Sequence, residues 1–275
     1  MNISDDIFSA VMEDMRGAAE AEILPRFLGV TAEGIRTKTA PDDLVTDADI
    51  GAERRLTAAL SAHFPEALLV GEEAVSADPA ILSRLGDADL AVIIDPVDGT
   101  WNFAHGVPLF GMIVAVVSGG ETVAGLIHYP LTGDFLAARR GRGAWHIARD
   151  GTRTRLSVAA AGPVAAMHGL VPLHMFPACD QPAYARRLLQ FNRTTTWRCS
   201  AYEYRMVATG AMSFCLNADL KPWDHAAGSL IHREAGGYGA LLSGEAYRPA
   251  MTEGRLLLAP DAESWEAIRR GFAEG

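Results

Sequence analysis

The chain has 275 residues, of which 49% are apolar, enough to build a sizeable core in one large domain or two moderate ones. Its 24 Lys and Arg against 34 Asp and Glu give a net charge of −10. No basic run alternates with aromatic residues, so we expect no nucleic-acid partner. The start is acidic and amphipathic, and the longest apolar stretch, around 109–117, is too short to span a bilayer. We therefore expect a cytoplasmic protein without membrane contact.

The cysteines also exclude two classes of site. Cys179, Cys199 and Cys215 are an odd number at wide spacing, which fits neither a disulfide framework nor a structural zinc site. We expect them to be reduced, buried thiols.

The first elements are predicted to be helices. Ser4 is a suitable cap, and the apolar residues after it recur at steps of three or four. The same period runs from Asp49 to Phe64 and predicts a second helix that starts close to Asp49. Asp47 and Asp49 therefore lie at a helix entrance.

Strands are predicted next. Residues 90–94 are apolar and rich in β-branched side chains, and they end at Asp95-Pro96, which indicates a buried strand that stops in a turn. A second apolar run covers 110–117, and alternating segments near 122–128 and 134–138 suggest a β-meander. This pattern predicts helices over an antiparallel sheet.

The pattern changes beyond about Gly151. Residues 155–159 and 166–171 are predicted strands, and 181–191 and 203–209 are predicted helices, an alternation typical of an α/β unit.

The change divides the chain into an α+β half at 1–150 and an α/β half at 151–275 that completes the site. No repeat or Ser/Pro-rich linker separates the halves, so we expect an extensive interface and a cleft between them.

The most informative segment runs from Ala91 to Phe103, where a strand delivers two carboxylates into one turn. Proline at 96 fixes one backbone angle and Gly99 tolerates positive φ. Asp95, Asp98 and the Val97 carbonyl can then face one point. Oxygen ligands suit magnesium or manganese, whereas zinc favours His or Cys.

Two further acidic patches support a metal site over an ordinary surface turn. Glu72 and Glu73 follow a short apolar run, and Asp224 precedes a helical segment with small residues at 226–228. Each patch alone has a simpler explanation, a solvated loop or a helix N-cap. We assign the neighbouring His225 to packing or a hydrogen bond, not to a metal.

Together these segments resemble the inositol monophosphatase family, and they occur in the family order. The resemblance covers about residues 38–237 and rests on four motifs: Asp43-Leu44-Val45-Thr46-Asp47-Ala48-Asp49, Gly71-Glu72-Glu73, Asp95-Pro96-Val97-Asp98-Gly99-Thr100 and Trp223-Asp224-His225-Ala226-Ala227-Gly228.

The resemblance implies a fold and a set of roles. The fold is a layered α-β-α-β-α sandwich with an antiparallel sheet in the first half. The implied metal ligands are Glu72, Asp95, the Val97 carbonyl, Asp98 and Asp224, which would hold two or three Mg²⁺ ions, with Mn²⁺ as an alternative. Thr100 and Asp49 would act with Glu72 in catalysis by orienting the attacking water, and Glu73 would support the site from behind. The implied substrate contacts are the Gly99 and Thr100 amides, Asn217, Asp224 and Lys38.

The implied activity is magnesium-dependent hydrolysis of a small phosphorylated metabolite by an activated water, in a protein that forms a homodimer. A rival is the Asp-X-Asp-Gly-Thr loop of haloacid-dehalogenase-like phosphatases, which attack with the first Asp, here Asp95. Another class is a regulatory interaction protein that keeps the same scaffold.

The alcohol part of the substrate stays open. Inositol enzymes usually carry Glu seven residues before the metal-binding Asp224, and this chain has Asn217 there. The candidates are inositol phosphate, fructose 1,6-bisphosphate, histidinol phosphate and a 3'-phosphoadenosine 5'-phosphate type of substrate. Arg198, Tyr202 and Lys221 are further candidate contributors to the substrate pocket.

Overall fold

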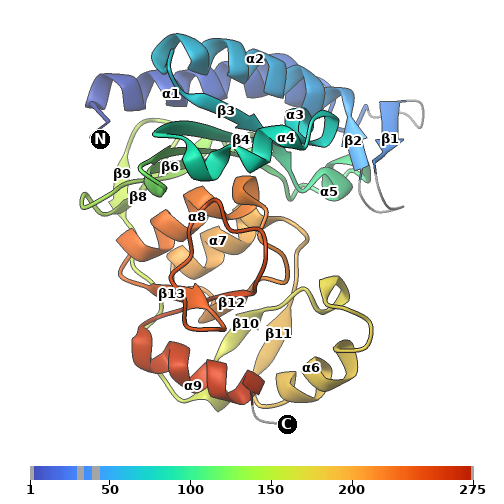
Figure 1. Cartoon of the computed structure of the whole chain (residues 1–275), viewed down its shortest axis with the longest axis vertical. Helices are drawn as coiled ribbons and strands as arrows, with labels where there is room; N and C mark the ends of the chain where they lie inside the picture. The colour runs from blue at the N-terminus through green and yellow to red at the C-terminus, as the bar shows by residue number, and fades with distance from the viewer. Residues whose placement is uncertain (1–2, 30–33, 39–43, 274–275) are drawn as a thin grey trace.

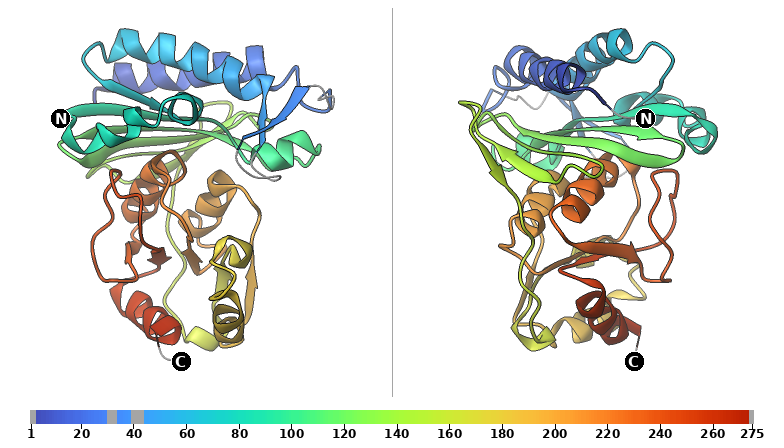
Figure 2. Two further views of the ribbon diagram at one scale, coloured as in Figure 1. Left: turned by 45° about the vertical axis from the view of Figure 1, so that its right-hand side comes forward. Right: turned by 90° about the vertical axis from the view of Figure 1, so that its left-hand side faces the viewer.

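The structure, a computed structural model, describes residues 3–29, 34–38 and 44–273. Asp43, from the first motif, lies outside them. Figure 1 shows stacked layers in the order helices, large sheet, helices, smaller sheet and helices. Both views in Figure 2 show the same order, with the start of the chain in the upper layers and its end at the bottom. The predicted α-β-α-β-α sandwich is confirmed.

The outer helical layer contains α1 (Asp5–Ala18) and α2 (Asp47–His63). The predicted cap holds, because the Ser4 hydroxyl accepts a hydrogen bond from the Ile7 amide at 3.2 Å. Thr46 caps α2 in a capping box with Asp49, so this helix begins two residues earlier than Asp49.

Within the described residues, the larger sheet has seven strands in chain order, with only the β3–β4 pair parallel. The strands are β3 (Leu68–Gly71), β4 (Leu90–Asp98), β5 (Gly111–Ser118), β6 (Glu121–Tyr129), β7 (Asp134–Arg139), β8 (Ala144–Ile147) and β9 (Arg153–Arg155).

Both faces of this sheet are buried, which explains why its central strands are continuous apolar runs. In β4, Val92 and Ile94 face the core under α1 and α2, whereas Ala91 and Ile93 face the core on the other side.

The middle layer contains α7 (Ser200–Ala208) and α8 (Pro222–Glu234), packed under the large sheet. Small residues permit this contact. A Cβ on Gly125 of β6 would lie only 2.8 Å from the Cα of Ala227 in α8. The helix that carries Asp224 can therefore approach the sheet that carries Asp95.

The smaller sheet has strand order β11-β10-β12-β14-β13 and separates the middle helices from α6 and α9. Its strands are β10 (His168–Leu170), β11 (Arg193–Thr195), β12 (Phe214–Leu216), β13 (Tyr238–Leu241) and β14 (Leu256–Ala259), and its outer helices are α6 (Gln181–Leu188) and α9 (Ala262–Ala273). The shorter elements are η1 (Ala19–Ile23), β1 (Ile35–Thr37), β2 (Leu44–Thr46), α3 (Glu72–Ala77), α4 (Ala80–Ser83), η3 (Leu85–Asp87), α5 (Thr100–Ala104), η4 (Val164–Ala166) and η5 (Leu173–Met175).

Three local predictions differ from the structure. The strand predicted at 155–159 is wrong apart from Arg155, which ends β9, and 156–163 form no regular element. The predicted turn at Asp95-Pro96 is wrong because β4 continues to Asp98. Cys179 is exposed, whereas Cys199 and Cys215 are buried free thiols as expected.

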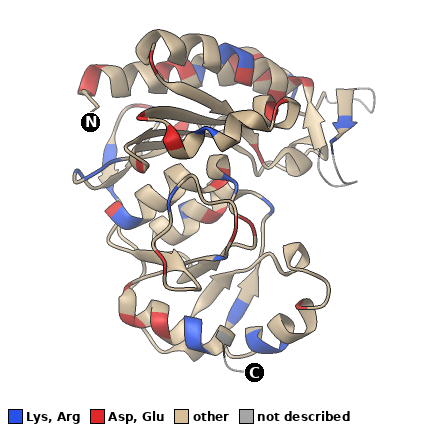
Figure 3. Ribbon diagram, viewed as in Figure 1, with Lys and Arg blue, Asp and Glu red and all other residues tan. Residues whose placement is uncertain are grey.

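The division into 1–150 and 151–275 stays a proposal. Among the helices of the described ranges, none is long and apolar enough to cross a membrane. Figure 3 shows acidic and basic residues on the helices of both halves.

Candidate active site

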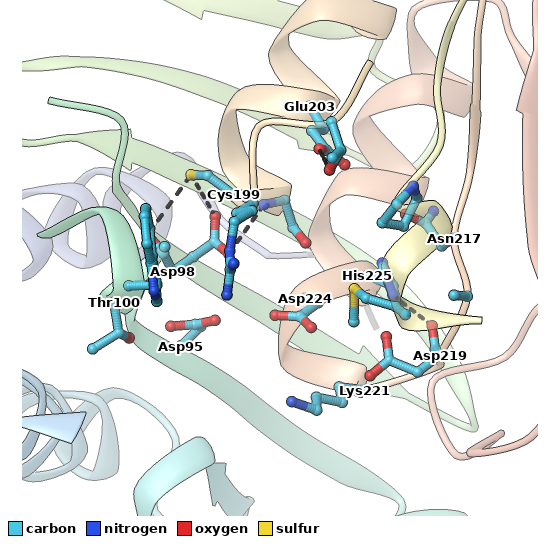
Figure 4. A pocket seen from close by; sticks show the side chains of 18 of the residues that line it. Asp95, Asp98, Thr100, Cys199, Glu203, Asn217, Asp219, Lys221, Asp224 and His225 are labelled. Carbon is cyan, nitrogen blue, oxygen red and sulfur yellow. Dashed lines mark hydrogen bonds between the residues drawn. The ribbon is translucent and has the colours of Figure 1, made fainter. Parts of the chain in front are cut away.

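A bulge near the end of β4 brings two carboxylates to the same place. Residues three apart in a regular strand point to opposite faces, so Asp95 and Asp98 would be separated. The pairing of β4 with β5 shifts register between these two residues, at Pro96, which has no N–H to donate. The bulge lets both buried side chains face one cavity (Figure 4).

The next residues turn the chain into α5 and bring in Asp49. Gly99 has φ of 86°, and a Cβ there would lie 2.8 Å from the Leu109 carbonyl oxygen, so only glycine fits. The Thr100 hydroxyl lies 2.9 Å from Asp49 Oδ1 and 2.9 Å from the Val97 carbonyl oxygen. Burial raises the pKa of Asp49 to about 6, with repulsion from Glu72 adding to it.

Helix α3 places Glu72 and Glu73 beside Lys38. The Lys38 Nζ atom lies 3.0 Å from Glu72 Oε1 and 2.6 Å from Glu73 Oε1. Burial opposes the charge on Lys38, but attraction to both glutamates outweighs it and raises the pKa of Lys38. Burial, with repulsion from Glu72, raises the pKa of Glu73 to about 7. Glu53 of α2 fixes the start of α3 by accepting the amides of Glu73 and Ala74, each at 2.8 Å.

Asp98 also anchors the start of α7. One carboxylate oxygen accepts the Ser200 amide at 3.0 Å, and the other accepts the Ala201 amide at 2.6 Å and the Cys199 thiol at 2.9 Å. Despite these bonds, burial raises the pKa of Asp98 to about 6.

Asp224 reaches the same place from the first turn of α8. Asp95, Asp98 and Asp224 can bring one oxygen each within 4.8 Å of one another, and Figure 4 shows these side chains converging. Burial, and then repulsion from neighbouring carboxylates including Glu72 and Asp98, raises the pKa of Asp95 well above its usual range. Burial likewise raises the pKa of Asp224, although Lys221 opposes the shift.

This donor set fits a hard divalent cation. Asp95 Oδ1 is buried and has no hydrogen-bond partner among the described residues. Several carboxylates held together away from water are unfavourable unless a cation compensates their charge. Oxygen ligands on one cavity are the set that magnesium prefers.

Residues from before and after position 150 line this cavity. It has a volume of about 330 Å³, a size suited to a small metabolite. Asn217, Arg198 and Lys221 line it, and Figure 4 places Asn217 on the side opposite Thr100. Tyr202 instead packs against Tyr129, with ring centroids 5.0 Å apart.

The histidine beside Asp224 is occupied elsewhere. His225 Nε2 lies 2.9 Å from the Asp219 carbonyl oxygen, and its Nδ1 lies 3.1 Å from the Tyr204 hydroxyl. Burial lowers the pKa of His225 to about 4, so the ring is neutral at pH 7. Its assignment to hydrogen bonding agrees with this geometry, although the ring is also close to Asp219 and Asp224.

Sequence reasoning missed the residues that support the site from a distance. Glu53 lies 19 positions before Glu72 in the sequence, and Cys199 and the Ser200 and Ala201 amides lie about a hundred positions after Asp98. Glu203 also lines the cavity, and burial raises its pKa to about 7. The only local signal was the odd cysteine count, with Cys199 four residues before the helix predicted at 203–209.

The sequence matches the inositol monophosphatase family over residues 7–272. This chain belongs to that family. The inositol-1-monophosphatase of Rhizobium meliloti is 32% identical over 206 residues, 72% of each chain. The histidinol-phosphatase of Mycobacterium tuberculosis is 32% identical over 219 residues, 77% of this chain and 80% of that one. The Nus factor SuhB of Vibrio cholerae is 31% identical over 216 residues, 74% of each.

Solved structures show the same fold. The suhB protein of Bartonella henselae superposes with a TM-score of 0.80 at 24% identity, over 98% of this chain and all of that one. An IMPase of Thermotoga maritima gives the same score and identity over 98% and 97%. Family membership and the relatives named as phosphatases identify the chain as a phosphoric monoester hydrolase.

Proposed function

We propose that this family member hydrolyses a small phosphate monoester of a polyol, sugar or related metabolite in a magnesium-dependent reaction. The observation that supports the proposal is the cluster of buried Asp95 and Asp98 with half-buried Asp224, in which an oxygen of Asp95 has no partner among the described groups. The proposed metal ligands are Glu72, Asp95, the Val97 carbonyl, Asp98 and Asp224. Manganese is an alternative ion.

Magnesium bound there would neutralise charge on the phosphate and acidify a water molecule. The protein's own contribution is to move the proton. With its hydrogen directed to Asp49, the Thr100 hydroxyl keeps lone pairs free to accept a proton from water. Asp49 has a pKa of about 6, and it can take up the proton that Thr100 passes on.

We propose the following roles for the residues that the sequence predicted to contact the substrate. The Gly99 and Thr100 amides would bind phosphate oxygens. The Asn217 amide would hydrogen-bond the alcohol part of the substrate. Lys38 touches Glu72 and Glu73 and is not among the residues that line the cavity, so we propose that it acts through these glutamates.

The complete set of predicted carboxylates favours catalysis over a purely regulatory interaction role. The regulatory role is the alternative, because some relatives are named Nus factor SuhB. Relatives are also named histidinol-phosphatase and fructose-1,6-bisphosphatase/inositol-1-monophosphatase. A homodimer and a cytoplasmic location stay predictions.

Phosphate release should be measured from inositol, fructose bisphosphate, histidinol and phosphoadenosine esters in the presence of magnesium. We expect at least one ester to be hydrolysed, with no phosphate trapped on the protein. A stable aspartyl-phosphate on Asp95 would support the haloacid-dehalogenase-like mechanism instead. No release from any ester, together with recovery of one stoichiometric protein partner, would support the regulatory role.

A further inference from the structure

Arg198 has a backbone conformation that arginine rarely adopts. Its φ is 54°, and among the described residues only Leu28, with φ of 63°, is a second non-glycine residue with positive φ. A Cβ makes this region unfavourable, so glycine would satisfy the backbone better. A strained backbone at a residue that lines a cavity points to a function for its side chain there.

Two buried side chains hold the segment before α7 in this conformation. The Asn102 amide donates to the Trp197 carbonyl oxygen at 2.9 Å and contacts the Arg198 carbonyl oxygen at 3.4 Å. Glu203 Oε1 accepts the Trp197 amide at 2.8 Å and the Thr196 hydroxyl at 3.0 Å. These contacts impose the backbone of Arg198 from both sides.

The imposed backbone seats the Arg198 side chain on Trp101. The guanidinium carbon lies 4.5 Å from the centroid of the Trp101 ring, and Trp101 also stacks with His105 at 4.1 Å. Both Arg198 and Trp101 line the cavity, and Trp101 directly follows Thr100. A flat cation is therefore held on an aromatic surface beside the proposed phosphate site.

The side of the cavity away from Thr100 has a further hydrogen-bond donor. Asn217 is 5% exposed, and its Nδ2 atom has no partner in the described part of the chain. Lys221 and Asp219 also line the cavity and have opposite effects on the pKa of Asp224. The carboxylate cluster would repel a second anion on the substrate, whereas a guanidinium beside it would attract one.

We propose that Arg198 determines specificity by binding a second anionic group, a phosphate or a carboxylate, on the alcohol part of the substrate. The proposal rests on the proposed function, because it assigns part of the same cavity. Asn217 supplies a neutral donor on the far side of the cavity. The chemistry of the substrate is then a phosphate monoester with one more negative group.

The test compares pairs of esters that differ in one anionic group, in the presence of magnesium. One pair is inositol 1-phosphate and inositol 1,4-bisphosphate, and the other is glycerol 3-phosphate and 3-phosphoglycerate. These pairs separate a second phosphate from a carboxylate. The enzymes are the wild type, Arg198→Lys, Arg198→Gly and the control Leu28→Gly, which removes the same kind of backbone strain outside the cavity.

In at least one pair we expect the wild type to favour the doubly anionic ester in kcat/KM by roughly 10- to 100-fold. Arg198→Lys should lose part of this preference because an ammonium lacks the planar pair of donors. Arg198→Gly should lose all of it while its Tm stays equal to or above that of the wild type. Leu28→Gly should keep the preference.

Several results would overturn the proposal. These are a wild type without preference, equal losses on both members of each pair, or an Arg198→Gly protein that melts well below the wild type. Calorimetry of ester binding to a Thr100→Ala variant, with and without Arg198, separates this proposal from the proposed function. Suppose that the wild type turns over no ester, but the Thr100→Ala variant binds the doubly anionic member of a pair more tightly, and only when Arg198 is present. In that case the proposed function fails and the Arg198 site stands.

Discussion

Asp95 and Asp98 are neighbours in the same cluster but have opposite surroundings. Asp95 is 1% exposed, and one of its oxygens has no partner among the described groups. Asp98 accepts two amides and a thiol from the start of α7. The same carboxylate chemistry therefore has a cost in stability at one position and a structural role at the other.

Replacing each residue by Asn should separate these roles. Asp95→Asn should raise the Tm of the metal-free protein, because it removes a carboxyl whose charged form is disfavoured by burial and by the neighbouring carboxylates. Asp98→Asn should lower stability by about 1–3 kcal/mol, because the NH2 group of Asn would face the amide and thiol donors that Asp98 accepts. Both should lower kcat/KM by roughly a thousandfold. Thermal unfolding in a chelator checks the contrast, and equal Tm changes would show that the surroundings do not matter.

At the scale of elements, α3 depends on a side chain from another helix. Glu53 accepts two amides at the start of α3, and a Cβ on Gly71 would lie 2.3 Å from the Glu53 carboxyl carbon. The glycine is needed so that Glu53 can reach these amides. The contact sets where the helix that carries Glu72 begins.

Glu53→Ala should therefore reduce both stability and activity. Loss of the two capping bonds should cost about 1–2 kcal/mol, and misplacement of Glu72 should lower kcat by an order of magnitude or more. Glu53→Gln, which keeps one acceptor oxygen, should fall between the wild type and Glu53→Ala. Urea unfolding and steady-state kinetics measure the two effects. A Glu53→Ala protein with lower stability and unchanged kcat would show that α3 is held by other contacts.

The elements that sequence reasoning predicted are those with local signals. The cap at Ser4 and the long apolar strands follow from short-range patterns. The bulge between Asp95 and Asp98 depends on pairing with β5, which a linear motif does not encode. The missed contacts of Glu53 and Cys199 join distant segments. The segment 155–159 has apolar residues, but beyond Arg155 it pairs with no strand in the described part of the chain.

For the whole molecule, the metal-free site should make stability depend on pH. Burial raises the pKa of Asp98 to about 6 and those of Glu73 and Glu203 to about 7. Burial also lowers the pKa of His128, His225 and His232 to about 4, which has the opposite effect on stability below about pH 7.5. Unfolded histidines have a pKa of about 6.5, so these histidines are largely neutral in both states only above about pH 7.5, where the carboxylates dominate.

In that range the folded state binds more protons than the unfolded state, so stability falls as pH rises. We expect the Tm in a chelator to be lower at pH 8.5 than at pH 7.5, and magnesium to restore it at pH 8.5. The Asp95→Asn variant should show a smaller decrease. A metal-free Tm that rises between these two pH values would contradict the assignment of raised carboxylate pKa values.

The central claim is that these carboxylates hold divalent ions that the hydrolysis requires. Its most direct test is the rate of phosphate release from the best ester, measured first with magnesium, then with excess chelator, then after magnesium is added back. We expect the rate to fall by at least about a thousandfold with chelator and to return fully with magnesium. A rate that chelation leaves unchanged would contradict the claim.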